Sequence, residues 1–144
     1  MGQHLINLQQ LIHWRQIEQL NTTFARSLDG GKASDFVSIF TEDVAYRSGP
    51  RHFFGHEQLV EFFEKRAATG RVSRHFMSSL DIQFTTADQA IAHSKWMVFA
   101  GKGPLPIEGT APFLVADVTD ELRKNKGAWL ISARTITPVF RSVN

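Results

Sequence analysis

The chain of 144 residues has no cysteine and no long apolar run. Without cysteine it has no disulfides, thiolate metal sites or cysteine nucleophiles, which is compatible with a reducing compartment, so we expect a cytoplasmic protein. No apolar stretch approaches the roughly 20 residues of a membrane span, and the polar N-terminus lacks a signal-peptide core. We therefore expect no membrane partner.

Charge of one sign is also scarce. Sixteen basic and fourteen acidic side chains leave a net charge of +2, and no run of lysine or arginine forms a stripe that could follow phosphates. This pattern argues against a nucleic-acid partner. Phenylalanine is abundant instead, with twelve residues beside three tryptophans and a single tyrosine, which indicates an apolar interior or pocket. The length suits one domain over residues 1–144.

The N-terminal half follows helical periods. Apolar residues at spacings of three and four predict an amphipathic helix over about residues 4–29, ended by Gly30 and Gly31. The pattern slips near His13, so the first dozen residues form either its beginning or a separate short helix or arm. His4 and His13 are expected at the surface.

Two further helices and one short strand follow. Ser34 is a good N-cap for a short helix that reaches Phe40, and residues 56–68 form the third helix. Between them, residues 44–48 alternate as a strand that Gly49 and Pro50 stop.

From Arg71 onward the period changes from helical to alternating. The pattern predicts four successive strands, at about residues 72–85, 90–101, 109–123 and 127–140. The turns between them have lengths typical of antiparallel hairpins, and Pro112 inside the third strand marks an edge or a bulge. In the second strand the even positions from Ala92 to Ala100 are uncharged, so that face is the better candidate for a pocket wall. Helices first and a meander afterwards indicate the α+β class.

His75 lies within the alternating run Arg71–Met77 and is the candidate catalytic base. Asp29 is its candidate orienting partner, in the last turn of the first helix. A carboxylate there faces the negative end of the helix dipole and costs a few tenths of a kcal/mol or more. Either another group compensates for this cost, or Asp29 and Gly30 simply make a favourable turn. A lone strand histidine is, by itself, more often a structural residue.

A metal site is the weaker hypothesis. His52, His56 and Glu57 have the spacing of a helical metal-binding pair, but Gly55 interrupts them in a loop-like pattern. We expect no metal and no cofactor.

Several short stretches together resemble the SnoaL-like branch of the NTF2-like superfamily. They are Phe24-Ala25-x-x-x-Asp29, Asp35-Phe36, Ile39-Phe40-Thr41-x-Asp43-Val44, the helix opened by Gly55, and Arg74-His75-Phe76. The resemblance covers nearly the whole chain. It implies a cone-shaped α+β barrel, with three N-terminal helices packed on a curved, mostly antiparallel sheet. Because proteins of this build commonly pair through the outer face of the sheet, it also implies a homo-oligomer, a dimer or a trimer.

Within that superfamily the chain is similar to the scytalone dehydratases and bile-acid dehydratases. The similarity implies an Asp29–His75 pair, with Tyr46 assisting through water. Elimination of water next to a carbonyl needs a base for the α proton and a donor for the enolate oxygen. His75 and Tyr46 would fill those roles, and Asp29 would fix the histidine tautomer. The implied function is a cofactor-free lyase.

The departures from that family pattern make the expected substrate apolar. Leu28 and Phe24 stand where those dehydratases have tyrosines, and apolar residues replace most polar recognition groups. Arg134 either restores a positive group to the pocket or forms a salt bridge at the sheet edge. The expected substrate-binding residues are Phe24, Leu28, Trp96, Val98, Phe113, Val115 and Arg134. The expected partner is a small hydrophobic ring compound.

Two alternatives use the same fold. One is an isomerase of the ketosteroid type, in which the base removes and returns a proton with no leaving group. The other is a non-catalytic binding or assembly subunit, as the small subunits of ring-hydroxylating dioxygenases are.

Overall fold

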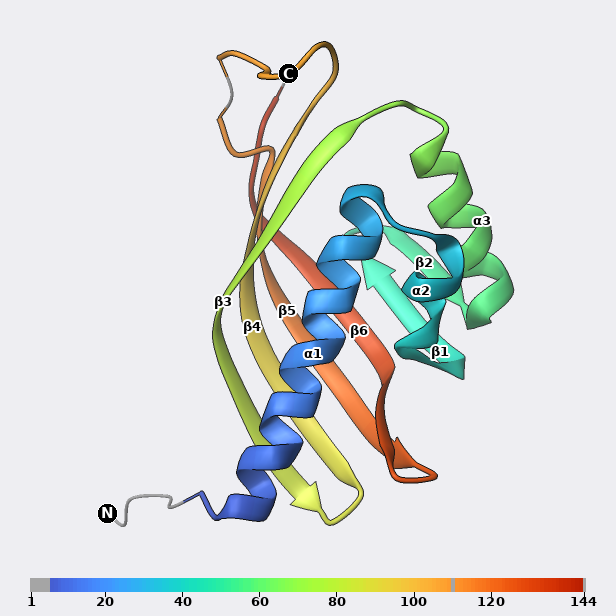
Figure 1. Cartoon of the computed structure of the whole chain (residues 1–144), viewed down its shortest axis with the longest axis vertical. Helices are drawn as coiled ribbons and strands as arrows, with labels where there is room; N and C mark the ends of the chain where they lie inside the picture. Colours follow the sequence, from blue (N-terminus) through green and yellow to red (C-terminus); the bar gives the residue numbers. More distant parts are fainter. Residues whose placement is uncertain (1–5, 110, 144) are drawn as a thin grey trace.

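Three helices pack on one face of a curved sheet in the computed structural model, which describes residues 6–109 and 111–143 (Figure 1). The elements are α1 (Leu8–Gly30), α2 (Ala33–Ser38), β1 (Phe40–Ser48), β2 (Arg51–Phe54), α3 (Gly55–Ala67), β3 (Val72–Thr86), β4 (Gln89–Gly101), β5 (Leu114–Asn125) and β6 (Ala128–Arg141). The six strands lie in the order β2-β1-β6-β5-β4-β3, antiparallel except for the parallel pair β1 and β6. The α+β class is confirmed, and the sheet stays open, with β2 and β3 at its edges.

A capping box sets the start of α1 at Leu8. The Asn7 side chain accepts a hydrogen bond from the Gln10 backbone N–H at 2.8 Å, and the Gln10 side chain accepts one from the Asn7 N–H at 3.3 Å. These two bonds satisfy otherwise unpaired donors of the first turn. The helix then runs unbroken to Gly30, so a separate short helix from Leu8 onward is wrong. His4 and the predicted helical start at residues 4 and 5 lie outside the described residues.

The other boundaries differ from the predictions in three places. The second helix stops at Ser38, and Phe40 already belongs to β1. Residues 51–54 form a short edge strand that the sequence analysis missed. The third strand of the meander begins at Leu114 rather than residue 109, so Pro112 lies in the β4–β5 connection and not inside a strand. No helix among residues 6–109 and 111–143 is both long enough and apolar enough to cross a bilayer.

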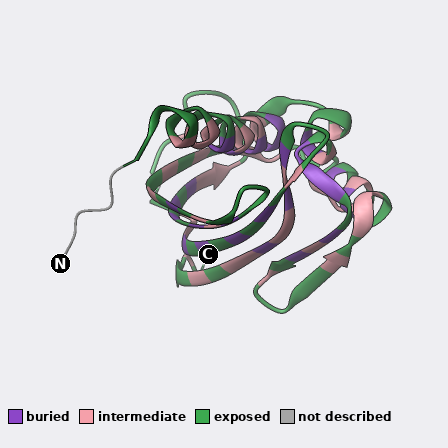
Figure 2. Ribbon diagram, turned by 90° about the horizontal axis from the view of Figure 1, so that it is seen from below, coloured by how far each residue is buried: buried purple, intermediate pink, exposed green. Residues whose placement is uncertain are grey.

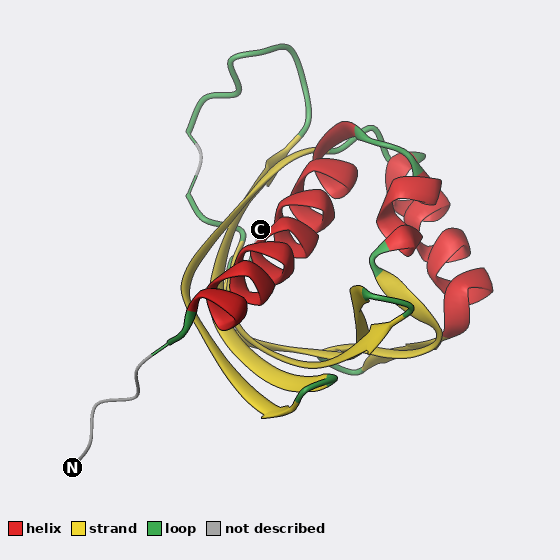
Figure 3. Ribbon diagram, turned by 60° about the horizontal axis from the view of Figure 1, so that its bottom comes forward, coloured by secondary structure: helices red, strands yellow, loops and turns green. Residues whose placement is uncertain are grey.

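The core lies between the concave face of the sheet and the helices (Figures 2 and 3). Phe36 of α2 is fully buried at its centre. Its ring lies 5.4–6.1 Å from four other phenylalanine rings, those of Phe24, Phe40, Phe62 and Phe63. Each such pair adds about 0.5–1.5 kcal/mol beyond area burial. Many of the phenylalanine residues therefore pack where the helices meet the sheet.

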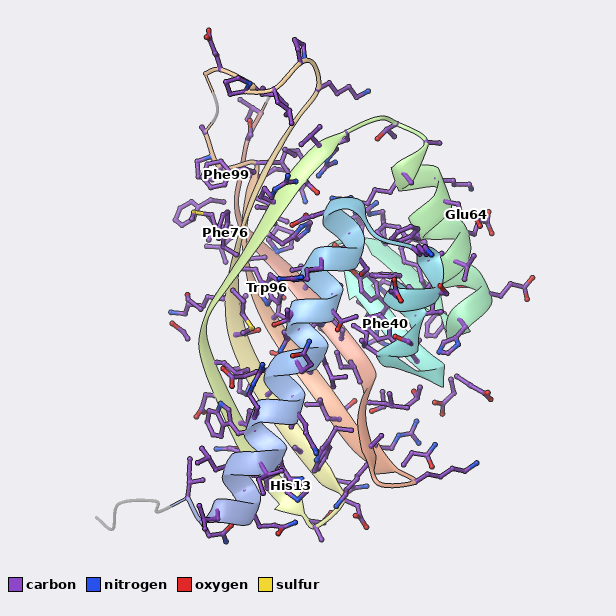
Figure 4. All side chains as sticks on the ribbon, viewed as in Figure 1. His13, Phe40, Glu64, Phe76, Trp96 and Phe99 are labelled. Carbon is purple, nitrogen blue, oxygen red and sulfur yellow. The ribbon has the colours of Figure 1, made fainter. Side chains whose placement is uncertain are left out.

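The outer face of the sheet carries an apolar row across four strands. Phe76 pairs with Met97, Met97 with Val115, and Val115 with Phe140 in the strand register. Phe76 and Phe140 are 54% and 69% exposed. Figure 4 shows Phe76 and Phe99 on the side of the sheet turned away from α1. The homo-oligomer stays a prediction, and this row is the outer surface that it would use.

Candidate active site

A cavity of about 860 Å³ lies between the concave face of the sheet and helices α1 and α3. Most of its wall is apolar, because inward-facing positions of the strands and the buried stripes of the helices carry aliphatic and aromatic side chains. These apolar lining residues are Phe24, Leu28, Phe53, Phe62, Trp96, Val98, Phe113, Leu114, Ala116, Val118 and Ile136. A cavity of this size and character can accept a multi-ring organic compound.

His75 lines this cavity, and Asp29, which is not among the lining residues, contacts the His75 ring. The His75 ring nitrogen Nδ1 lies 2.6 Å from Asp29 Oδ1, and the two side chains are only 9% and 15% exposed. Asp29 Oδ1 also accepts a hydrogen bond from the Ser73 hydroxyl at 2.8 Å, and Oδ2 accepts one from the His75 backbone N–H at 3.0 Å. Both carboxylate oxygens are therefore fixed by β3.

These contacts explain why a carboxylate is tolerated at the C-terminal end of α1. Burial raises the pKa of Asp29, but hydrogen bonds from the His75 ring and backbone and from Ser73, together with attraction to the His75 ring, outweigh it. The pKa of Asp29 therefore lies below its ordinary value. The hydrogen bonds from Ser73 and His75 therefore offset the unfavourable helix dipole at Asp29, so turn chemistry alone does not explain this residue.

The geometry leaves the far side of the His75 ring open. When the neutral ring donates its Nδ1 proton to Asp29, the lone pair sits on Nε2. Within the described chain, Nε2 has no hydrogen-bond partner, and His75 lines the cavity. The rings of Phe24 and Trp96 lie 6.0 and 6.4 Å from the His75 ring and 5.4 Å from each other, so the three rings form one cluster. The arrangement suits a base that acts on a molecule in the cavity.

Tyr46 also lines the cavity, from the middle of β1. It is 2% exposed, and burial raises its pKa to about 12 despite nearby arginines. The phenol therefore stays protonated at neutral pH and can donate a hydrogen bond. Among the described residues its hydroxyl makes no hydrogen bond.

Five of the seven predicted substrate-binding residues line the cavity: Phe24, Leu28, Trp96, Val98 and Phe113. Val115 does not, because the inward positions of β5 are Leu114, Ala116 and Val118. Val115 belongs to the outer apolar row.

Arg134 does not line the cavity either. It is fully buried, and its guanidinium donates to both carboxylate oxygens of Asp120, at 2.8 and 2.7 Å, and to the Asn21 side-chain oxygen. It also lies 4.4 Å from the centre of the Phe24 ring. Since β6 lies between β1 and β5, the predicted salt bridge at the sheet edge is an interior one instead.

The remaining histidines are dispersed. His52 lines the cavity from β2, whereas the His56 ring lies 2.9 Å from the Phe40 carbonyl oxygen. The described residues contain no group of three histidine or carboxylate side chains placed to hold a metal. His13 is half-buried and accepts a hydrogen bond from the Trp129 indole at 3.0 Å, so its prediction as a surface residue is wrong.

The predicted site residues do not include the cationic part of the lining, which comprises Arg51, Lys65, Arg66 and Arg71. They come from three separate segments of the chain. One signal was available: Arg71 has the same parity as Ser73 and His75, so extending the alternation back by two residues points it toward the same side as His75.

Helices on an open curved sheet, with a carboxylate–histidine pair whose histidine lines an apolar cavity, define the class of NTF2-like α+β proteins. The model of the SnoaL-like domain family matches residues 9–135, and the chain belongs to that family. No curated protein matches the sequence.

Solved structures agree on the fold. A Mycobacterium tuberculosis protein of unknown function is 22% identical with a TM-score of 0.82, over 94% of this chain and 76% of that one. A "Putative Scytalone Dehydratase" from Novosphingobium aromaticivorans is 18% identical with a TM-score of 0.79, over 90% and 86%. The β subunit of a "putative aromatic-ring-hydroxylating dioxygenase" from the same organism is 15% identical with a TM-score of 0.79, over 93% and 94%. These structures are similar in fold and carry diverse names.

Proposed function

We propose that the chain is a cofactor-free dehydratase that eliminates water from a cyclic, mostly apolar β-hydroxy carbonyl compound. The observation that carries the proposal is the 2.6 Å contact between Asp29 Oδ1 and Nδ1 of His75, a residue that lines the cavity. A structural ion pair would not need one histidine nitrogen left open toward an apolar space. The fold shared with a structure named for scytalone dehydratase supports the same class of reaction.

In this mechanism His75 Nε2 removes the proton α to the substrate carbonyl, and Asp29 stabilises the imidazolium that forms. The Tyr46 hydroxyl, directly or through water, donates to the enolate oxygen. The enolate then expels the β-hydroxyl, which takes the proton from His75 and leaves as water, while the carbon–carbon double bond forms. The histidine ends in its starting state. Proton transfer by such a base contributes about 10²–10⁴ in rate.

The test is a screen of ring-containing β-hydroxy ketones for loss of water. His75→Ala and Asp29→Ala should each abolish most of the turnover. His93→Ala and Asp117→Ala are matched controls, because both residues are exposed on strands of the same sheet and neither lines the cavity. Full activity in both His75→Ala and Asp29→Ala, on a substrate that the wild type converts, contradicts the proposal.

The isomerase alternative uses the same base and donor and differs in the fate of the proton. Mass spectrometry of the product separates the two, since isomerisation leaves the mass unchanged and dehydration removes one water. If ring compounds bind and none is converted, the non-catalytic alternative gains support, consistent with the fold of the dioxygenase β subunit.

A further inference from the structure

We propose that the ring compound bound in this cavity carries a carboxylate, and that Arg71, with Arg51, binds it at a part of the wall distinct from His75. This deepens the proposed function by naming a substrate class. The anion site itself does not depend on the proposed function. Only the statement that the opposite end of the molecule reacts at His75 rests on it.

The charged lining of the cavity is strongly one-sided. It consists of Arg51, Lys65, Arg66, Arg71 and a single carboxylate, Glu61. Glu61 is already paired with Lys65 at 2.9 Å, on the exposed surface of α3. In the described chain, the three arginines have no carboxylate partner within ion-pair distance. A chain with a net charge of only +2 thus concentrates unpaired positive charge in its main cavity.

Arg71 is the most specific of these groups. Its Nε is buried without a hydrogen-bond partner in the described residues, and its guanidinium carbon lies 4.4 Å from the centre of the Phe113 ring. An unsatisfied buried donor on a charged group is costly unless a ligand completes it. Burial, followed by repulsion from Arg51, holds the pKa of Arg71 below its usual range. A bound carboxylate would relieve both effects.

Arg66 has a different task. It donates to the Leu28 carbonyl oxygen at 3.0 Å and to the Ser73 hydroxyl at 3.2 Å, and Ser73 in turn donates to Asp29. Arg66 is therefore a positioning residue for the Asp29–His75 pair. Arg51 lies over the Phe62 ring at 5.6 Å and adds a second unpaired cation.

The spacing of Arg71 and His75 fits one substrate that contacts both. Arg71 directly precedes β3 and His75 lies four residues further on. Extended chain rises about 3.3 Å per residue, so their Cα atoms are at most about 13 Å apart. Both side chains line the same cavity, so the gap between their functional groups faces a bound molecule. A ring skeleton can span this gap with its reacting carbons at His75 and a carboxylate at Arg71. The planar guanidinium can hold the carboxylate through two parallel hydrogen bonds.

Binding of 2-naphthoate and 2-naphthamide tests the proposal, because the two molecules share a ring system and differ in charge. Trp96 lines the cavity and can report binding by fluorescence, with calorimetry as the second readout. We expect the wild type to bind naphthoate at least about tenfold more tightly, as charge-assisted pairing implies. Arg71→Gln should remove most of this preference, and Arg51→Gln part of it, with little change for naphthamide.

Arg47→Gln is the matched control, because Arg47 is an exposed arginine on β1 that does not line the cavity. It should keep the wild-type preference. The proposal is overturned if the wild type shows no preference for naphthoate, absence of binding included, or if the preference survives both Arg71→Gln and Arg51→Gln. His75→Ala should keep the preference, so a failure of the proposed chemistry and a failure of the anion site give different results.

Discussion

Two pairs of a carboxylate and a basic side chain pack close to the Phe24 ring. The Asp29–His75 pair has its ring 6.0 Å from the Phe24 ring, and the Asp120–Arg134 pair places its guanidinium 4.4 Å from the same ring. Both pairs have contacts of 2.6–2.8 Å. Their residue chemistry is similar, and their access to the cavity differs.

Access to the cavity distinguishes the structural pair, Asp120–Arg134, from the proposed reactive pair, Asp29–His75. The side chains of Arg134 and Asp120 are 0% and 2% exposed and neither lines the cavity, so this pair fixes Asn21 and Phe24 in place. Asp29 is equally well supplied with hydrogen bonds, but its partner His75 lines the cavity, and His75 Nε2 makes no hydrogen bond within the described chain. A buried ion pair alone therefore identifies no active site.

The largest expected effect comes from Asp120→Asn. Arg134 would then be left as a buried charge without a counter-ion, which costs about 3–5 kcal/mol of unfolding free energy. Urea unfolding followed by circular dichroism measures it. Asp117→Asn, at an exposed site on the same strand, should change stability by no more than about 0.5 kcal/mol. Equal stability of the two variants would contradict the structural role of the interior pair.

Asp29→Asn should lower turnover strongly and stability only slightly, which is the opposite of Asp120→Asn. The asparagine keeps the shape of the side chain but no longer stabilises an imidazolium, so turnover should fall by about 10³. The unfolding free energy should fall by only about 1 kcal/mol, since most of the hydrogen bonds can re-form. Steady-state kinetics and urea unfolding of the same preparation give both numbers. A loss of stability as large as that of Asp120→Asn would erase the distinction between the pairs.

Tyr46→Phe should lower turnover by about 10², the usual cost of removing one donor to a developing oxyanion. Substrate affinity should change little, because the phenyl ring keeps its packing. Since burial raises the pKa of Tyr46 to about 12, the wild-type rate should show no inflection from this phenol between pH 6 and about pH 10. An unchanged rate for the variant would remove Tyr46 from the mechanism.

The pH dependence of stability gives the smallest effect. The pKa of Asp29 in the folded protein lies below its ordinary value of 3.8, so the stability that it contributes is present above that value and is lost as the pH falls through the folded pKa. Acidification from pH 6 to pH 3 should therefore destabilise the wild type more than Asp29→Asn. The midpoints of urea unfolding of the two proteins should converge at low pH. Parallel curves would contradict the lowered pKa.

Much of the fold follows from local patterns in the sequence. Helical spacing and the glycines that end α1, together with the alternation after Arg71, gave the helices and the four long strands within a few residues. The edge strand at residues 51–54 was missed because four residues are too few to show a period. Only the last part of the β4–β5 connection, from residue 109 to residue 113, is wrongly predicted as strand, because Ala111 and Phe113 alternate with Val115.

Long-range pairing explains the error at Arg134, whereas Val115 faces outward because β5 alternates regularly and Phe113 lies before its start. Continuing the hairpin register from the pair Asn125 and Ala128 would place Asp120 opposite Ala133. An irregularity between Glu121 and Leu122 shifts the register by one residue and brings Arg134 opposite Asp120. A second one, between Val115 and Ala116, lies at the start of β5. No local pattern announces such shifts, whereas the meeting of Asp29 and His75 needed only the order of the elements and the family resemblance.

Phe113 lies in a loop, whereas most of the cavity wall comes from helices and strands. It ends the connection between β4 and β5, which extends beyond the sheet in Figure 3, and backbone bonds of 2.7 Å to Val98 and 2.9 Å to Ser142 hold it in place. Loops accept insertions and replacements far more readily than strands do. Evolution or protein design can therefore replace residues of this connection and change which ring compounds bind. Asp29 and His75 would stay on the helix and strand that align them.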